Sequence, residues 1–150
     1  MAQRSAKAVW YGGLKTGKGT IELGSGKFKG QYSFQSRFES GPGTNPEELI
    51  GGAHAACFSM ALAAGLEKAG YPPESIETTA RVALNEVQDG FAITTIELDT
   101  RGHVPGINED TFLEQARIAK DNCPVSRVLT GARISLKARL ISEHPVTAAP

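Results

Sequence analysis

The two cysteines, Cys57 and Cys123, are the residues of this chain with the greatest potential for chemistry. A thiolate can act as a nucleophile, a metal ligand or a redox centre, and cysteine pairs in a reducing compartment are more often catalytic than structural. Free cysteines are also common as small buried apolar residues. The surroundings of each cysteine must therefore distinguish a reactive role from a packing role.

Cys57 lies in a segment, residues 49–66, that contains no charged side chain. Apolar burial raises the pKa of a thiol and leaves the sulfur inert unless a cation lies nearby. Arginine suits this purpose because it keeps its charge in an apolar pocket. Arg37, in the turn-rich stretch 36–45 that we expect to be an exposed loop, is the best-placed candidate.

The other polar residues near the cysteines form weaker patterns. His54 precedes Cys57 by three positions, so both share one helix face and a Cys-His nucleophile pair is one interpretation. A core or partner-facing histidine fits the sequence better. Zinc would need four ligands, and the histidines and cysteines show no metal-ligand spacing, so we expect no metal.

The composition is that of an ordinary soluble protein, with 40% hydrophobic and 21% charged residues. Lysine plus arginine equals aspartate plus glutamate, at 16 each, so no overall charge attracts nucleic acid. The first residues contain no apolar run, which indicates no secretory signal and predicts a cytoplasmic protein.

The chain is long enough for one domain with a proper core, residues 1–150. Asn45, Pro46 and the two glutamates that follow are typical of a helix start, and Gly70 of a helix end. The predicted elements are a β-meander (1–35), a central helix (45–70), a β-hairpin (75–104), helices (108–131), a final strand (132–142) and a tail (143–150).

The central helix is dominated by alanine and glycine and lacks a polar stripe. It has about the length of a membrane span, but it is only weakly hydrophobic and strand-rich sequence surrounds it. A helix buried on every side fits better, and a chain of this length struggles to cover such a helix completely, which suggests a partner subunit. We therefore predict an α+β fold, with no membrane segment, in an obligate homodimer.

Two runs of sequence carry a family resemblance. The run TNPEELIGGAHAACFSMAL (residues 44–62), together with DNCPVSRVL (residues 121–129), resembles the OsmC/Ohr family of organic hydroperoxide reductases. HAACFSMAL and CPVSRVL are more similar to the OsmC branch. The segments GKGTIELGSG, QYSFQSRFE, GFAITTIELD and VPGINEDTF extend the similarity across the chain.

The resemblance implies antiparallel sheets around a long buried helix in an intertwined homodimer, without metal or bound cofactor. Cys57 matches the peroxidatic cysteine and Cys123 the resolving cysteine. Arg37 matches the active-site arginine and Glu47 its glutamate partner. The implied enzyme is an antioxidant stress-response peroxidase, which reduces organic hydroperoxides through a Cys57 sulfenic acid and a Cys57–Cys123 disulfide.

An external dithiol, either of lipoyl type or another small dithiol, would reduce that disulfide. Phe58 and Met60 are expected to line the apolar substrate site. If the helix is continuous, Glu47 and Cys57 lie about 15 Å apart along its axis. We therefore expect Arg37 and Glu47 to complete the site around Cys57 of a second subunit, unless the helix breaks at Gly51-Gly52.

Two other functions remain as alternatives. The first is a non-enzymatic stress-storage or ligand-binding protein whose cysteines merely pack. The second is a Cys-His thiol hydrolase that depends on His54.

Overall fold

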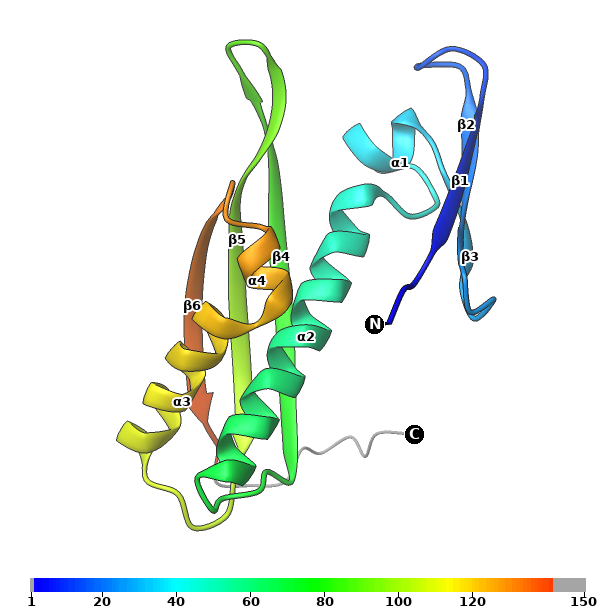
Figure 1. Cartoon of the computed structure of the whole chain (residues 1–150). Coiled ribbons are helices and arrows are strands. Elements are labelled where there is room, and N and C mark those ends of the chain that lie inside the picture. Colours follow the sequence, from blue (N-terminus) through cyan, green and yellow to red (C-terminus); the bar gives the residue numbers. More distant parts are fainter. Residues whose placement is uncertain (1, 142–150) are drawn as a thin grey trace. The chain divides into compact units, whose positions relative to one another are not determined.

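The computed structural model describes residues 2–141. The chain forms two compact units, Met1–Leu49 and Ile50–Pro150, which we call the N-terminal and C-terminal units and describe separately (Figure 1). The tail predicted for residues 143–150 lies outside the described residues.

The N-terminal unit contains the expected meander. Its strands β1 (Ala6–Tyr11), β2 (Lys18–Leu23) and β3 (Lys29–Tyr32) form an antiparallel sheet in the order β1-β2-β3. Glycine-rich turns separate the strands, as the sequence indicated.

A short helix, α1 (Phe34–Phe38), occupies part of the stretch that was expected to be an exposed loop. Ser33 caps it: its hydroxyl accepts from the N–H of Ser36 at 3.1 Å, and the Ser36 hydroxyl accepts from the N–H of Ser33 at 2.8 Å. This reciprocal pair satisfies two backbone donors, which is enough to stabilise a single turn. The exposed-loop prediction was wrong here, because serine-rich sequence resembles a turn.

The long helix α2 (Pro46–Lys68) crosses from the N-terminal unit into the C-terminal unit and shows no break at Gly51-Gly52. Asn45 accepts from the N–H of Glu48 at 2.8 Å and so caps the helix as predicted. At the other end Gly70 adopts φ +95°, a left-handed conformation that glycine tolerates.

The C-terminal unit continues with β4 (Ser75–Val87), β5 (Gly90–His103), α3 (Glu109–Asn122), α4 (Pro124–Val128) and β6 (Arg133–Leu140). Its sheet has the order β4-β5-β6. The hairpin β4-β5 is antiparallel, but β6 pairs parallel to β5, with Ile134 opposite Ile96. The expectation of purely antiparallel sheets is wrong at this edge, since the crossover through α3 and α4 returns the chain to the end of the sheet where β5 begins, and β6 then runs in the same direction as β5.

One face of α2 packs into the core of the C-terminal unit. His54, Phe58, Leu62 and Leu66 recur every fourth position and are fully buried. They belong to, or lie beside, an apolar cluster formed with β5, α3 and the segments that follow them. Its other fully or nearly fully buried members are Leu98, Val104, Ile107, Phe112, Ala116, Ala119 and Cys123.

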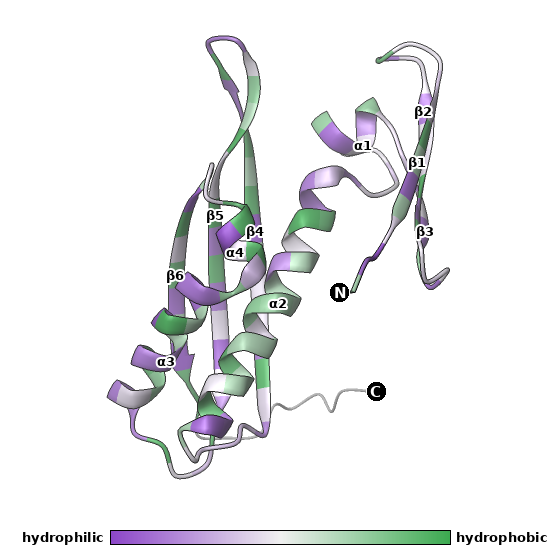
Figure 2. Ribbon diagram, viewed as in Figure 1, coloured by the Kyte–Doolittle hydropathy of each residue, from purple (hydrophilic) through white to green (hydrophobic). Residues whose placement is uncertain are grey.

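Figure 2 shows that most of α2 is coloured as weakly to strongly hydrophobic. The residues opposite its buried face are nevertheless exposed in this single chain. Gly52, Ala56, Met60 and Ala64 also recur every fourth position, and Met60 is 74% exposed. By length and composition alone α2 could cross a membrane, but core helices of soluble proteins pass the same test. Because this face of α2 is exposed, the predicted burial of the helix on every side is not reached within one chain.

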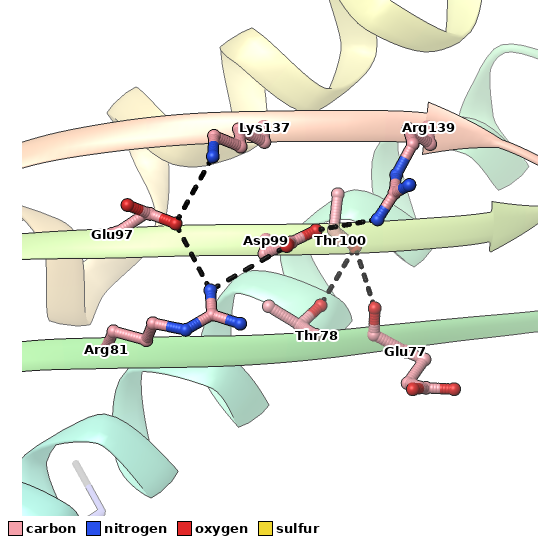
Figure 3. A network of polar contacts seen from close by, with 8 residues as sticks. All are labelled: Glu77, Thr78, Arg81, Glu97, Asp99, Thr100, Lys137 and Arg139. Carbon is pink, nitrogen blue, oxygen red and sulfur yellow. Dashed lines mark hydrogen bonds and ion pairs between the residues drawn. The ribbon is translucent and has the colours of Figure 1, made fainter.

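The outer face of the C-terminal sheet carries charges of alternating sign (Figure 3). Arg81 of β4 lies 3.2 Å from Glu97 and 3.7 Å from Asp99 of β5, and Lys137 and Arg139 of β6 each lie 3.8 Å from one of these carboxylates. The alternate positions of β6 are apolar and half-buried. This alternation sets which face of the sheet the helices cover.

Candidate active site

Cys123 lies at the junction of α3 and α4 and is fully buried. Its N–H donates to the carbonyl of Ala119 at 2.9 Å, which closes α3. Pro124 disfavours helical geometry in the residue before it, and Cys123 accordingly has φ −55° and ψ 127°. The proline therefore forces the turn that directs the Cys123 side chain into the core.

Cys57 faces Cys123 from the middle of α2. Its side chain is half-buried, and its thiol forms a hydrogen bond with the Cys123 sulfur. The fold thus brings the two sulfurs into contact although 66 positions separate them in sequence (123 − 57). Both cysteines are present as free thiols. The contact is what a reversible disulfide requires.

Different surroundings set the acidity of the two thiols. Burial raises the pKa of Cys57, its hydrogen bond to Cys123 raises it further, and a hydrogen bond from the N–H of Val125 acts in the opposite direction. Burial also acts to raise the pKa of Cys123. Hydrogen bonds from Cys57, Ser126 and Val125 together outweigh it, so the pKa of Cys123 lies below its ordinary value.

These shifts set the two thiols apart. Within the described residues, hydrogen bonds to Cys123 favour its ionised form, whereas burial and the contact with Cys123 disfavour the ionised form of Cys57. The predicted Cys57 thiolate needs a further cation, because no lysine or arginine is among the groups that shift its pKa. This agrees with the expectation that burial alone leaves Cys57 inert.

Arg37 and Glu47 meet within the N-terminal unit. Nε of Arg37 donates to Oε1 of Glu47 at 2.8 Å and to Oε2 at 3.3 Å, and a terminal guanidinium nitrogen lies 2.8 Å from Oε1. The Glu47 side chain is 9% exposed and that of Arg37 36%. A carboxylate so placed fixes the plane of the guanidinium and leaves its outer edge free to bind another group.

Local hydrogen bonds hold this pair in register. The Ser36 hydroxyl donates to the carbonyl of Thr44 at 2.7 Å, and the Asn45 amide donates to the carbonyl of Ser36 at 3.1 Å. These bonds tie the end of α1 to the start of α2. Arg37 and Glu47, ten positions apart, are thereby brought together.

Arg37 also borders an apolar cavity of about 230 Å³ in the N-terminal unit. The sequence prediction did not include this cavity. In the sequence, only the aromatic residues close to Arg37 could have indicated such a cavity. The cavity is lined by Trp10, Leu14, Tyr32, Ser33, Phe34, Arg37 and Phe38.

The two predicted substrate contacts, Phe58 and Met60, lie on different sides of α2. Phe58 is fully buried in the core cluster next to Cys57, whereas Met60 belongs to the exposed apolar face. Neither residue lines the cavity beside Arg37.

His54 is buried, as the favoured interpretation of the sequence required, and its contact is not with Cys57. Its Nε2 lies 2.7 Å from the hydroxyl of Ser126 on α4. Among residues 2–141 no group of three or more potential metal ligands gathers. The described residues thus contain a two-thiol site without a metal cluster.

The fold and the contacting thiols define a thiol-based redox protein of mixed α+β architecture. Residues 39–138 match the family model described as OsmC-like protein. The chain belongs to the OsmC-like family, as its sequence resemblance indicated.

Relatives of known name agree with this assignment. The chain is 52% identical to peroxiredoxin OsmC of Escherichia coli over 140 residues, which cover 93% of this chain and 97% of that protein. It is 31% identical to an organic hydroperoxide resistance protein of Xanthomonas axonopodis over 61% of this chain and 63% of that protein. Among solved structures, the organic hydroperoxide resistance protein OhrB of Bacillus subtilis has the same fold, with a TM-score of 0.69, 24% identity, and coverage of 91% and 98%.

Proposed function

We propose that this protein is a thiol-dependent peroxidase that reduces organic hydroperoxides to alcohols. Cys57 is the attacking sulfur and Cys123 the resolving one. The observation that carries the proposal is the contact between the two thiols. The name of the 52% identical relative, a peroxiredoxin, supports the same chemistry.

The first step consumes the proton that the two sulfurs share. When the proton lies on Cys123, the Cys57 thiolate attacks one peroxide oxygen and the O–O bond breaks. Cys57 becomes a sulfenic acid, and the departing alkoxide takes the Cys123 proton to become the alcohol. Cys123 is then the thiolate that attacks the Cys57 sulfur, which releases hydroxide and forms the disulfide.

The cation that favours the Cys57 thiolate is the Arg37 guanidinium, oriented by Glu47. On an unbroken α2 the ten positions from Glu47 to Cys57 correspond to about 15 Å, too far for direct contact along one helix. We therefore propose that Arg37 and Glu47 act on Cys57 of a second copy of the chain. The exposed apolar face of α2 supports such a homodimer, because soluble proteins seldom leave a stripe of this kind uncovered.

An alkyl group of the substrate would bind on the apolar side of this site. The aromatic cavity next to Arg37 and the exposed Met60 supply suitable surfaces, and Phe58 supports Cys57 from within the core. Such surroundings favour an alkyl or lipid hydroperoxide over hydrogen peroxide, since apolar contact adds binding energy only for the former.

A dithiol, either of lipoyl type or another small dithiol, reduces the disulfide by thiol–disulfide exchange, and no bound cofactor takes part in the cycle. We propose a soluble cytoplasmic protein in which the whole chain makes one OsmC-like domain as part of the intertwined dimer.

The peroxidase proposal is tested by adding one equivalent of cumene hydroperoxide to the reduced protein. Mass spectrometry of non-reduced peptides should then find Cys57 linked to Cys123 in the same chain. Cys57→Ser should abolish turnover with a dithiol. Normal peroxide consumption by that variant, or two unchanged thiols in the native protein, would contradict the proposal and favour a binding function.

The dimer is tested separately through the exposed face of α2. Ala56→Glu places a charge in the middle of this face and should convert the dimer to a monomer in sedimentation analysis. Ser135→Glu, on the exposed outer face of β6, is the matched control and should remain dimeric. A monomeric native protein would refute assembly through this face.

A further inference from the structure

The buried pair formed by His54 and Ser126 has no role in the chemistry described so far. The two residues come from α2 and α4, 72 positions apart, and join at 2.7 Å with exposed fractions of 0% and 3%. Burying this histidine costs folding free energy, because Nδ1 of its ring has no hydrogen-bond partner among the described residues. The contact with Ser126 leads directly to Cys123.

Ser126 connects the imidazole to the resolving sulfur. Its hydroxyl and its backbone N–H both form hydrogen bonds with Cys123, and the N–H of Val125 forms another. Since Ser126 follows Cys123 by three positions at the start of α4, the turn forced by Pro124 directs these donors at the sulfur. His54, Ser126, Cys123 and Cys57 therefore form one continuous chain of hydrogen bonds.

The direction of this chain follows from the unpaired atom of His54. Within the described residues Nδ1 is buried without a partner, and burial lowers the pKa of the imidazole, so the ring is neutral. An unpaired lone pair is tolerated better than an unpaired buried N–H, which places the proton on Nε2. Nε2–H then donates to the Ser126 oxygen, and the Ser126 hydroxyl donates to Cys123.

Few charged side chains lie near this series of hydrogen bonds. The inward positions of β5 and β6 hold aliphatic residues, threonine and glycine, none of which titrates. Cys57 on α2 is the titratable group whose interaction shifts the Cys123 pKa. The charged side chains nearest in sequence, on α3 and α4, are at least partly exposed: Lys120, Asp121 and Arg127.

We propose that His54 and Ser126 are positioning residues that hold Cys123 as a thiolate aimed at Cys57, and so govern the disulfide-forming step. The proposal rests on the peroxidase function. In that step the Cys123 thiolate attacks the sulfenic sulfur, the S–S bond forms, and the S–O bond breaks. Hydroxide leaves and takes a proton from solvent to give water, so neither His54 nor Ser126 gains or loses a proton overall.

A direct test measures the ionisation of Cys123 alone. In a Cys57→Ser background the ultraviolet absorbance of the thiolate reports the titration of Cys123. Adding Ser126→Ala should move the midpoint upward by about one to two pH units, because a hydrogen bond to an ionised group is lost. An unchanged midpoint would overturn the proposal, and this result does not depend on peroxidase activity.

Two substitutions of His54 distinguish the effect of its Nε2–H hydrogen bond from the effect of its packing volume. Glutamine carries its amide nitrogen near the position of Nε2, whereas asparagine reaches only as far as Nδ1. The midpoint should therefore stay near that of the parent in His54→Gln and rise in His54→Asn. Equal midpoints in the two variants would show that the imidazole only packs.

The kinetic test follows a single turnover of the otherwise native chain by rapid quench, with a strained cyclic alkyne to trap the sulfenic acid. Ser126→Ala should slow disulfide formation at neutral pH by about tenfold to a hundredfold more than it slows sulfenic acid formation. Its pH profile should move upward, while Ser135→Ala on the exposed face of β6 should match the native chain. Equal slowing of both steps refutes the positioning role, whereas absence of both the sulfenic acid and the Cys57–Cys123 disulfide in the native chain refutes the peroxidase itself.

Discussion

Replacing Glu47 by glutamine tests whether its carboxylate orients the Arg37 guanidinium. The change is nearly isosteric, but it removes the charge that accepts two guanidinium nitrogens at 2.8 Å and leaves one neutral oxygen. Hydrogen bonds between charged partners contribute about 1.5–3 kcal/mol each. Because the Arg37 side chain is 36% exposed, solvent replaces part of this, and we expect a net loss of about 1–2 kcal/mol.

The loss should appear in both stability and catalysis. Urea unfolding should show a lower free energy of unfolding for Glu47→Gln. Stopped-flow oxidation by cumene hydroperoxide should slow by about tenfold, since each 1.4 kcal/mol of lost thiolate stabilisation lowers the rate about tenfold.

A matched exposed ion pair provides the control. Arg81 and Glu97 lie 3.2 Å apart, with side chains 59% and 37% exposed, so Glu97→Gln should change stability by less than about 0.5 kcal/mol and leave the peroxide reaction unaltered. If Glu47→Gln reacts with peroxide at the native rate, Arg37 does not need this carboxylate for orientation and the reasoning fails.

Three further outcomes are expected. Cys123→Ser should leave a Cys57 sulfenic acid that dimedone traps in mass spectrometry, and a failure to trap it would contradict Cys57 as the attacking thiol, because no other thiol remains in the chain. Burial lowers the pKa of His54 in the folded chain, so the neutral imidazole contributes fully to stability only above its unfolded pKa of 6.5, and this contribution is lost as the pH falls. In urea titrations, His54→Gln should therefore lose less stability than the native chain between neutral and mildly acidic pH. Gly102→Ala would drive a Cβ into the Phe112 ring and should lower the unfolding free energy by about 1–3 kcal/mol, unlike Gly131→Ala, where nothing lies within 4 Å.

The elements of the fold were largely predictable because their signals are local. Asn45, Pro46 and Gly70 marked the ends of α2 within a residue or two, and alternating polarity marked β4, β5 and β6. The short helix α1 was missed because its stabilising contact is a reciprocal serine pair that looks like turn chemistry. The parallel pairing of β6 was missed because a strand pattern does not reveal the direction of its neighbour.

The composition of the site was predictable to a smaller extent. Arg37 was the best-placed cation in the sequence, Glu47 was named as its partner from the family motifs, and their pairing is present in the N-terminal unit. Sequence reasoning placed His54 on the Cys57 face of the helix, but it could not connect the imidazole to Ser126, 72 positions away. The aromatic residues around Arg37 were visible in the sequence, yet nothing in their spacing indicated that Trp10 and Leu14 complete a cavity with them.

By itself the sequence determined which residues could react and where the helices and strands begin and end, because caps, prolines and periodicity act over a few residues. Only the tertiary structure decided that the two thiols have different surroundings. Burial acts to raise the pKa of both Cys57 and Cys123, yet the pKa of Cys57 lies above its ordinary value and that of Cys123 below it. The difference arises from the donors of Ser126 and Val125 that α4 directs at Cys123, and such directed hydrogen bonds exist only once the chain has folded.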